Sequence, residues 1–107
     1  MPIQSDPQFA AIAAAASGNN TLVAAVTGKR IRVLGFVLVG AGAVTAKFQS
    51  GAGGTDLTGA MTMAAASVVA VPPNEPGCFE TAVGALLNLN LSAAVSVAGL
   101  LVYRTVE

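Results

Sequence analysis

Residues 30–39 read Arg-Ile-Arg-Val-Leu-Gly-Phe-Val-Leu-Val, and this stretch decides the fold class. It is rich in β-branched and aromatic residues, and successive side chains of a strand point to opposite faces. The alternation sorts its residues into two faces: one holds Ile31, Val33, Val37 and Val39, and the other holds Leu34, Phe36, Leu38, Arg30 and Arg32. The strand is therefore predicted to begin with one face in contact with solvent and to become apolar on both of its faces. This is typical of a strand that enters a subunit contact, and equally of a central strand covered by its own chain.

Similar short alternating runs surround this strand and are separated by Gly, Pro and Asn turns. Further strands are predicted over residues 21–26, 44–49, 57–63, 67–71, 78–81, 87–92 and 95–104. Turns or loops are predicted over residues 17–20, 27–29, 40–42, 51–56 and 72–77. Seven or eight short strands at about ten-residue spacing indicate a β-sandwich or a small barrel, and we favour a single β-sandwich over residues 9–107.

The N-terminal region is harder to assign. Residues 1–8 contain Pro2 and Pro7, which bias their predecessors away from helix, so an extended arm is predicted. Residues 9–16 are mostly alanine, which favours helix, but eight residues without a capping box make a marginal helix. We expect this segment to be extended.

The composition indicates a subunit of an assembly. Of the 107 residues, 54% are hydrophobic and 9% are charged, and the net charge is zero. Such a surface favours association, and it offers no basic footprint for nucleic acid. The single cysteine, Cys78, excludes an internal disulfide and is expected to be a small buried residue.

A membrane protein is not expected. Residues 82–102 carry no charge, but Asn88, Asn90, Ser92 and Ser96 recur at strand spacing, and a spanning helix would bury those groups in lipid. The N-terminus has no basic region of the kind that opens a secretory signal.

The chain is poorly supplied for catalysis. It has no histidine, which excludes Ser-His-Asp and Cys-His devices and makes a zinc site implausible. Its five acidic residues are scattered, and Asp56 has no partner at calcium-loop spacing. The glycines at 51–54 lack the Lys-Ser/Thr of a phosphate loop. Asn88 and Asn90 could bind a sugar or bond across strands, and the second interpretation is favoured. No catalytic residue, metal or cofactor is predicted.

Four runs of residues carry a resemblance: 17–34, 46–59 (AKFQSGAGGTDLTG), 77–82 (GCFETA) and 84–92 (GALLNLNLS). Together they resemble small virion proteins of tailed bacteriophages, in particular capsid decoration (cement) proteins. The resemblance implies a jelly-roll-like β-sandwich that is made in the bacterial cytoplasm and sits as a homotrimer on the outer capsid surface, bound to the major capsid protein. Cys78 departs from the pattern, because a large aromatic residue would be expected beside Phe79.

The expected function is thus a non-enzymatic capsid decoration protein. The alternative is a receptor- or glycan-binding module of a phage tail or fibre. Contacts are expected from the arm, from a small basic cluster and from two loops: Ile3, Phe9, Lys29, Arg30, Arg32, Gly53, Gly54, Asp56, Pro72, Pro73 and Glu75. The basic cluster can also be interpreted as a solvated strand end, and this interpretation is slightly favoured.

Overall fold

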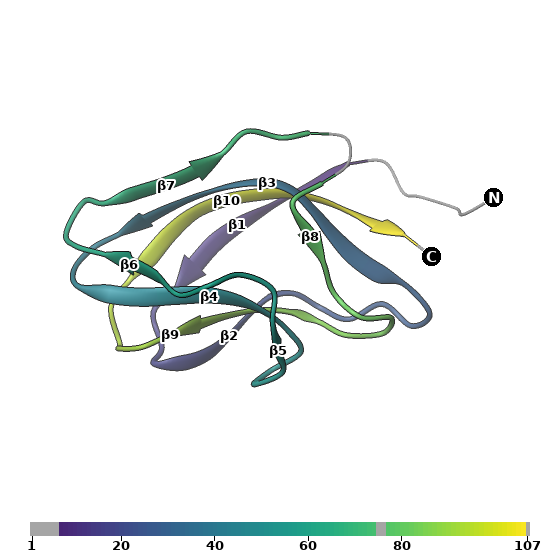
Figure 1. Ribbon diagram of the computed structural model, residues 1–107, viewed down its shortest axis with the longest axis horizontal. Helices are drawn as coiled ribbons and strands as arrows, with labels where there is room; N and C mark the ends of the chain where they lie inside the picture. Colours follow the sequence, from purple (N-terminus) through teal and green to yellow (C-terminus); the bar gives the residue numbers. More distant parts are fainter. Residues whose placement is uncertain (1–6, 75–76, 107) are drawn as a thin grey trace.

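A computed structural model describes residues 7–74 and 77–106, and within these residues the chain forms ten β-strands and no helix (Figure 1). The strands are β1 (Gln8–Ala14), β2 (Gly18–Val23), β3 (Arg30–Gly40), β4 (Val44–Ser50), β5 (Thr55–Asp56), β6 (Met61–Met63), β7 (Val68–Val71), β8 (Phe79–Glu80), β9 (Leu87–Leu91) and β10 (Val97–Val106). In this part of the chain no helix is long and apolar enough to cross a membrane.

The strands form two antiparallel sheets that face each other, as the two layers of Figure 1 show. Sheet A has the order β1-β10-β3-β7, and β8 also pairs with β3; sheet B has the order β2-β9-β4-β5, and β6 also pairs with β4. β7 and β8 share one edge of β3, and β5 and β6 share one edge of β4, so the ten strands occupy eight positions. The chain crosses between the sheets at most connections, as in a jelly roll, but β4, β5 and β6 follow one another in sheet B, and β7 and β8 follow one another in sheet A. The predicted all-β sandwich is confirmed.

A β-bulge in β3 changes which residues face the core. Val102 and Tyr103 of β10 pair with Gly35 and Val33, so Leu34 is the extra residue. Ile31 and Val33 face inward before the bulge, whereas Phe36 and Leu38 do so after it. The predicted faces were therefore wrong beyond Leu34. Strict alternation across residues 30–39 does not reveal the added residue.

Three aromatic rings join the two sheets. Phe36 of β3, Phe48 of β4 and Phe79 of β8 pack with ring centroids 4.9 Å (Phe36–Phe48), 5.0 Å (Phe48–Phe79) and 6.1 Å (Phe36–Phe79) apart. Phe48 is fully buried, and the buried aliphatic side chains of both sheets continue the core around it.

The first strands differ from their predicted bounds. The Ala-rich segment is extended, as expected, and it forms β1, which begins at Gln8 within the predicted arm. β2 begins at Gly18, where a turn was predicted, because Asn19 and Asn20 pair with β9. It ends at Val23, and residues 24–26 are exposed.

Cys78 is exposed, which corrects the expectation that it is buried. It directly precedes β8 at the edge of β3, where the Cys78 backbone N–H donates to the Val33 carbonyl. Its thiol donates to the Leu34 carbonyl at 3.4 Å. Partial burial raises the pKa of this thiol, against a smaller lowering by the Asn74 side chain.

Candidate association surface

The outer side of sheet A, away from the core, is apolar over most of its length. Its exposed and half-buried side chains there come from four strands, and none of them carries a polar group. We call this surface the apolar face; it consists of Phe9, Ala11, Ala13, Val37, Val39, Val68, Ala70, Ala98, Leu100 and Val102.

The register explains how these residues share one face. Directly paired residues of antiparallel strands lie on the same side of a sheet. One row across the sheet runs Ala11, Leu100, Val37 and Ala70, and the next runs Ala13, Ala98, Val39 and Val68.

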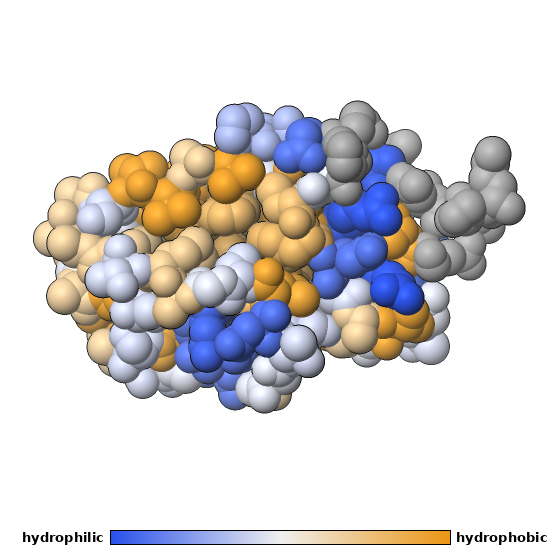
Figure 2. Space-filling model, viewed as in Figure 1, coloured by the Kyte–Doolittle hydropathy of each residue, from blue (hydrophilic) through white to orange (hydrophobic). Residues whose placement is uncertain are grey.

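Several large side chains on this face are strongly exposed. The exposed fractions are 79% for Phe9, 62% for Val68 and 48% for Leu100. Figure 2 shows hydrophobic residues gathered over β7, at one end of sheet A. A contiguous apolar surface of this kind is typical of a protein–protein contact.

The apolar face ends where charged residues begin. Arg104, Arg32 and Glu80 form a row across β10, β3 and β8, and Arg32 pairs with Glu80 at 3.4 Å. A pocket of about 230 Å³ lies at this boundary and is lined by Pro7, Leu34, Pro73, Asn74 and Val102. Gly35 makes the close packing possible, because a Cβ there would lie 2.7 Å from the backbone nitrogen of Pro73.

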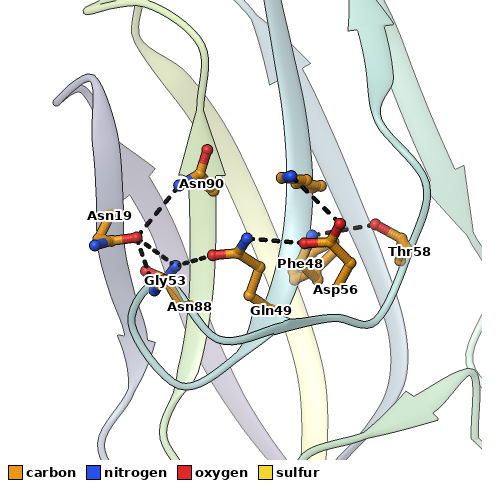
Figure 3. A network of polar contacts seen from close by, with 9 residues as sticks. Asn19, Phe48, Gln49, Gly53, Asp56, Thr58, Asn88 and Asn90 are labelled. Carbon is orange, nitrogen blue, oxygen red and sulfur yellow. Dashed lines mark hydrogen bonds and ion pairs between the residues drawn. The ribbon is translucent and has the colours of Figure 1, made fainter.

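The outer side of sheet B has the opposite character. We call it the polar face; it consists of Asn19, Thr21, Thr45, Lys47, Gln49, Asp56, Thr62, Asn88 and Asn90. Figure 3 shows that many of these side chains bond to one another in a continuous network.

Asn88 is the centre of this network and is fully buried. Its Nδ2 donates to Asn19 Oδ1 at 3.0 Å and to Gln49 Oε1 at 2.9 Å, and its Oδ1 accepts from the Asn20 backbone N–H at 2.8 Å. Asn19 Oδ1 also accepts from Asn90 Nδ2 and from the backbone N–H of Gly53. Both amide hydrogens of Asn88 are thus used within the protein, which confirms the cross-strand interpretation for Asn88.

Asp56 closes the network at the other edge. Its carboxylate accepts from Gln49 Nε2 at 2.8 Å and from Lys47 Nζ at 3.3 Å. These bonds, that from Gln49 first, hold the pKa of Asp56 below its ordinary value.

The structure does not bring the predicted contact residues into one site. Phe9 lies on the apolar face, and Pro73 lines the pocket at the end of that face. Asp56 lies on the polar face. Gly53, in the loop before Asp56, is bonded to the polar face through Asn19. Four other predicted residues lie apart from the apolar face: Lys29 and Arg30 at the start of β3, Arg32 in its ion pair, and Gly54 in the turn before β5. Pro72 is exposed beside Pro73, and Ile3 and Glu75 lie outside the described residues.

Sequence reasoning missed most of the apolar face. Val68, Ala98 and Leu100 were not singled out, although a subunit contact was one of the two interpretations of the apolar faces of residues 30–39. The missing information was the pairing that aligns β1, β10, β3 and β7.

No known family model matches the chain, and no curated protein matches it significantly. One solved structure, from work describing Bacillus endospore appendages as a novel family of disulfide-linked pili, is similar in fold. It has a TM-score of 0.55 and 18% sequence identity, over 98% of this chain and 86% of that chain. At this identity the likeness shows a shared fold alone.

Proposed function

We propose that this chain is a non-enzymatic structural protein that binds the outside of a bacteriophage capsid through its apolar face and stabilises the shell. The observation that carries the proposal is that the outer side of sheet A exposes Phe9, Val68 and Leu100 with no polar side chain among them. Water contact with such a surface is unfavourable, so covering it provides a driving force for assembly.

The size of the apolar face suits a contact that is repeated by symmetry. With strands about 4.8 Å apart and residues about 3.4 Å apart, the face covers a few hundred Å². A stable pairwise complex usually buries about 800 Å² on each partner, so one such contact is weak. Copies that also contact one another bind together more strongly through avidity.

The stabilising mechanism is linkage. A protein that binds the assembled shell and not the free capsid subunits shifts the equilibrium toward the shell. In this arrangement the apolar face lies against the capsid, and the hydrogen-bonded polar face lies toward solvent.

Two further observations favour a structural role. The sequence resembles capsid decoration proteins in residues 17–34, 46–59, 77–82 and 84–92, a resemblance that suggests a homotrimer partnered with the major capsid protein on the virion surface. The fold is also that of a protein described as forming pili, another repeated assembly.

The proposal is tested by co-sedimentation of the protein with heads assembled without it, from the phage that encodes it. Leu100→Lys and Val68→Lys place a charge on the apolar face and should each lower head binding about tenfold or more, because a lysine would be desolvated there. Thr62→Lys makes the same charge change on the exposed part of the polar face and should bind like the wild type.

Equal binding by Leu100→Lys and Thr62→Lys would exclude the apolar face as the contact. A folded wild-type protein that ignores heads but binds a host glycan in an array would favour the receptor-binding alternative. The mass from light scattering tests the trimer separately.

A further inference from the structure

Strand β1 forms one edge of sheet A and is paired on one side. All seven of its residues pair with β10 in an uninterrupted register, from Gln8 opposite Tyr103 to Ala14 opposite Val97. Among residues 7–74 and 77–106, no other strand pairs with it. The backbone N–H and C=O groups on its second side are therefore available for another strand.

β1 lacks the features that usually prevent pairing between sheet edges. It contains no charged residue, no proline and no bulge. The other edges are protected: β7 has four residues and is followed by Pro72, β2 carries a bulge between Thr21 and Val23, and β5, β6 and β8 have only two or three residues each. Within the described part of the chain, β1 is the edge most open to strand addition.

We propose that β1 pairs with β1 of a second copy, antiparallel and across a twofold axis at Ala11, so that sheet A continues through both subunits. Pairing of identical strands occupies both open edges at once and leaves the short β7 at each end of the joined sheet. If β1 paired instead with a different strand of another copy, the β1 edge of that other copy would remain unpaired.

The side chains of β1 suit this register. Ala11 lies opposite Ala11 of the partner subunit, and Phe9 lies opposite Ala13 of the partner subunit. Phe9 is 79% exposed in the single chain, and a small alanine opposite it leaves room for its ring. The twofold keeps the apolar faces of both copies on the same side, so that they form one larger surface.

This contact is separate from the proposed binding to a capsid and needs no other protein. It is twofold, whereas the trimer suggested by the resemblance is threefold. On a shell, the strand pair would join neighbouring trimers.

The experiment measures the mass of the purified protein by sedimentation at several concentrations. Ala11→Lys places two lysines directly opposite each other across the twofold and should raise the dissociation constant of the β1–β1 contact about tenfold or more. Ala70→Lys is the matched control, because Ala70 is an exposed alanine in the same row of the same face, on the opposite edge strand β7. It should associate like the wild type.

A second measurement uses cysteine in a Cys78→Ser background. Ala11→Cys should give a disulfide-linked dimer under mild oxidation, and Ala98→Cys, one strand inward on the same face, should not. Thermal unfolding of each variant verifies that it is folded.

A wild-type protein that is monomeric at all concentrations, or an assembly that Ala11→Lys leaves intact, would overturn the inference. Loss of association in both lysine variants would also overturn it, because both residues lie on the apolar face and the copies would then associate through that face and not through the edge of β1. A dimer formed through β1 that ignores phage heads would refute the proposed function and leave this inference standing.

Discussion

At the scale of single residues, the polar face is built from groups that satisfy one another. Asn88, which lies on the outer side of sheet B, is buried because Asn19, Gln49 and the Gly53 turn enclose it. A buried amide is stable only when its donors and acceptor are bonded, and here each of them is. The amide groups at the centre of the polar face are thus bonded within the chain, whereas the apolar face exposes large hydrophobic side chains.

Asp56 makes the stability of the protein depend on acid. Its pKa is lowered in the folded state from the ordinary value of 3.8 by the bonds from Gln49 and Lys47. The folded state therefore binds this proton less readily than the unfolded state, so the stabilisation is present above the unfolded pKa and is lost as the pH falls through the folded pKa. We expect wild-type stability toward urea to decline as the pH falls below about 5, and that of Asp56→Asn to decline less.

Lys47→Gln is the control for this prediction. The hydrogen bond from Gln49 is the largest single cause of the lowered pKa of Asp56, and Lys47 adds a hydrogen bond and its charge, so Lys47→Gln should remove only a part of the acid dependence. An Asp56→Asn variant with the same acid dependence as the wild type would show that other carboxyl groups are responsible.

At the scale of elements, the strands of sheet A approach one another closely where a residue lacks a side chain. Gly99 in β10 has a φ of +151°, and a Cβ there would lie 1.8 Å from the carbonyl oxygen of Val37. Neighbouring β3 could not keep its position against an added methyl group. The central pair β10–β3 thus depends on this glycine.

Gly99→Ala is expected to destabilise the fold by about 3 kcal/mol, because the backbone must shift and the φ is unfavourable for alanine. The measurement is the midpoint of urea unfolding. Gly59→Ala is the matched control, since its Cβ would meet nothing within 4 Å, and its stability should stay within about 0.5 kcal/mol of wild type. Equal stability of the two variants would mean that the backbone of β10 can shift to accommodate a methyl group at position 99 without loss of stability.

At the scale of the whole molecule, one core joins two sheets whose outer faces differ. Phe48 of sheet B contacts Phe36 and Phe79 of sheet A, and this aromatic group forms much of the junction. The exposed side chains of the apolar face are not part of this core, so they can be substituted without disturbing the fold.

Two phenylalanine variants test this separation. Phe48→Ala removes a fully buried ring and should cost about 3–5 kcal/mol in unfolding free energy. Phe9→Ala removes a ring that is 79% exposed and should change the stability of the dilute, unassociated protein by less than about 0.5 kcal/mol, while it weakens self-association. A large loss of stability in Phe9→Ala would place that ring in the core of the single chain.

Local chemistry made much of the fold predictable. Alternation in residues 30–39 and 87–92 and the Gly, Pro and Asn turns predicted an all-β sandwich, because the two-residue repeat of a strand is visible in the sequence. Some local backbone conformations could not be predicted from the residue type. Ala66 adopts a φ of 62° in a turn where glycine or asparagine is the usual sign.

The candidate site was less predictable. Phe9 and the basic residues 29, 30 and 32 were chosen by residue type, but the apolar face also draws on Val68, Ala70, Ala98 and Leu100. The sequence of any one strand does not reveal this face, since each strand contributes only two or three apolar residues to it.

By itself the sequence determined the class of the fold and the poverty of charged and catalytic side chains, because strand periodicity and composition are local properties of the chain. Only the tertiary structure decided which apolar residues are core and which are surface. The bulge at Leu34 reverses the faces of β3, and pairing between strands distant in sequence gathers the exposed rows into one face. Both depend on long-range hydrogen bonding, which no local pattern records.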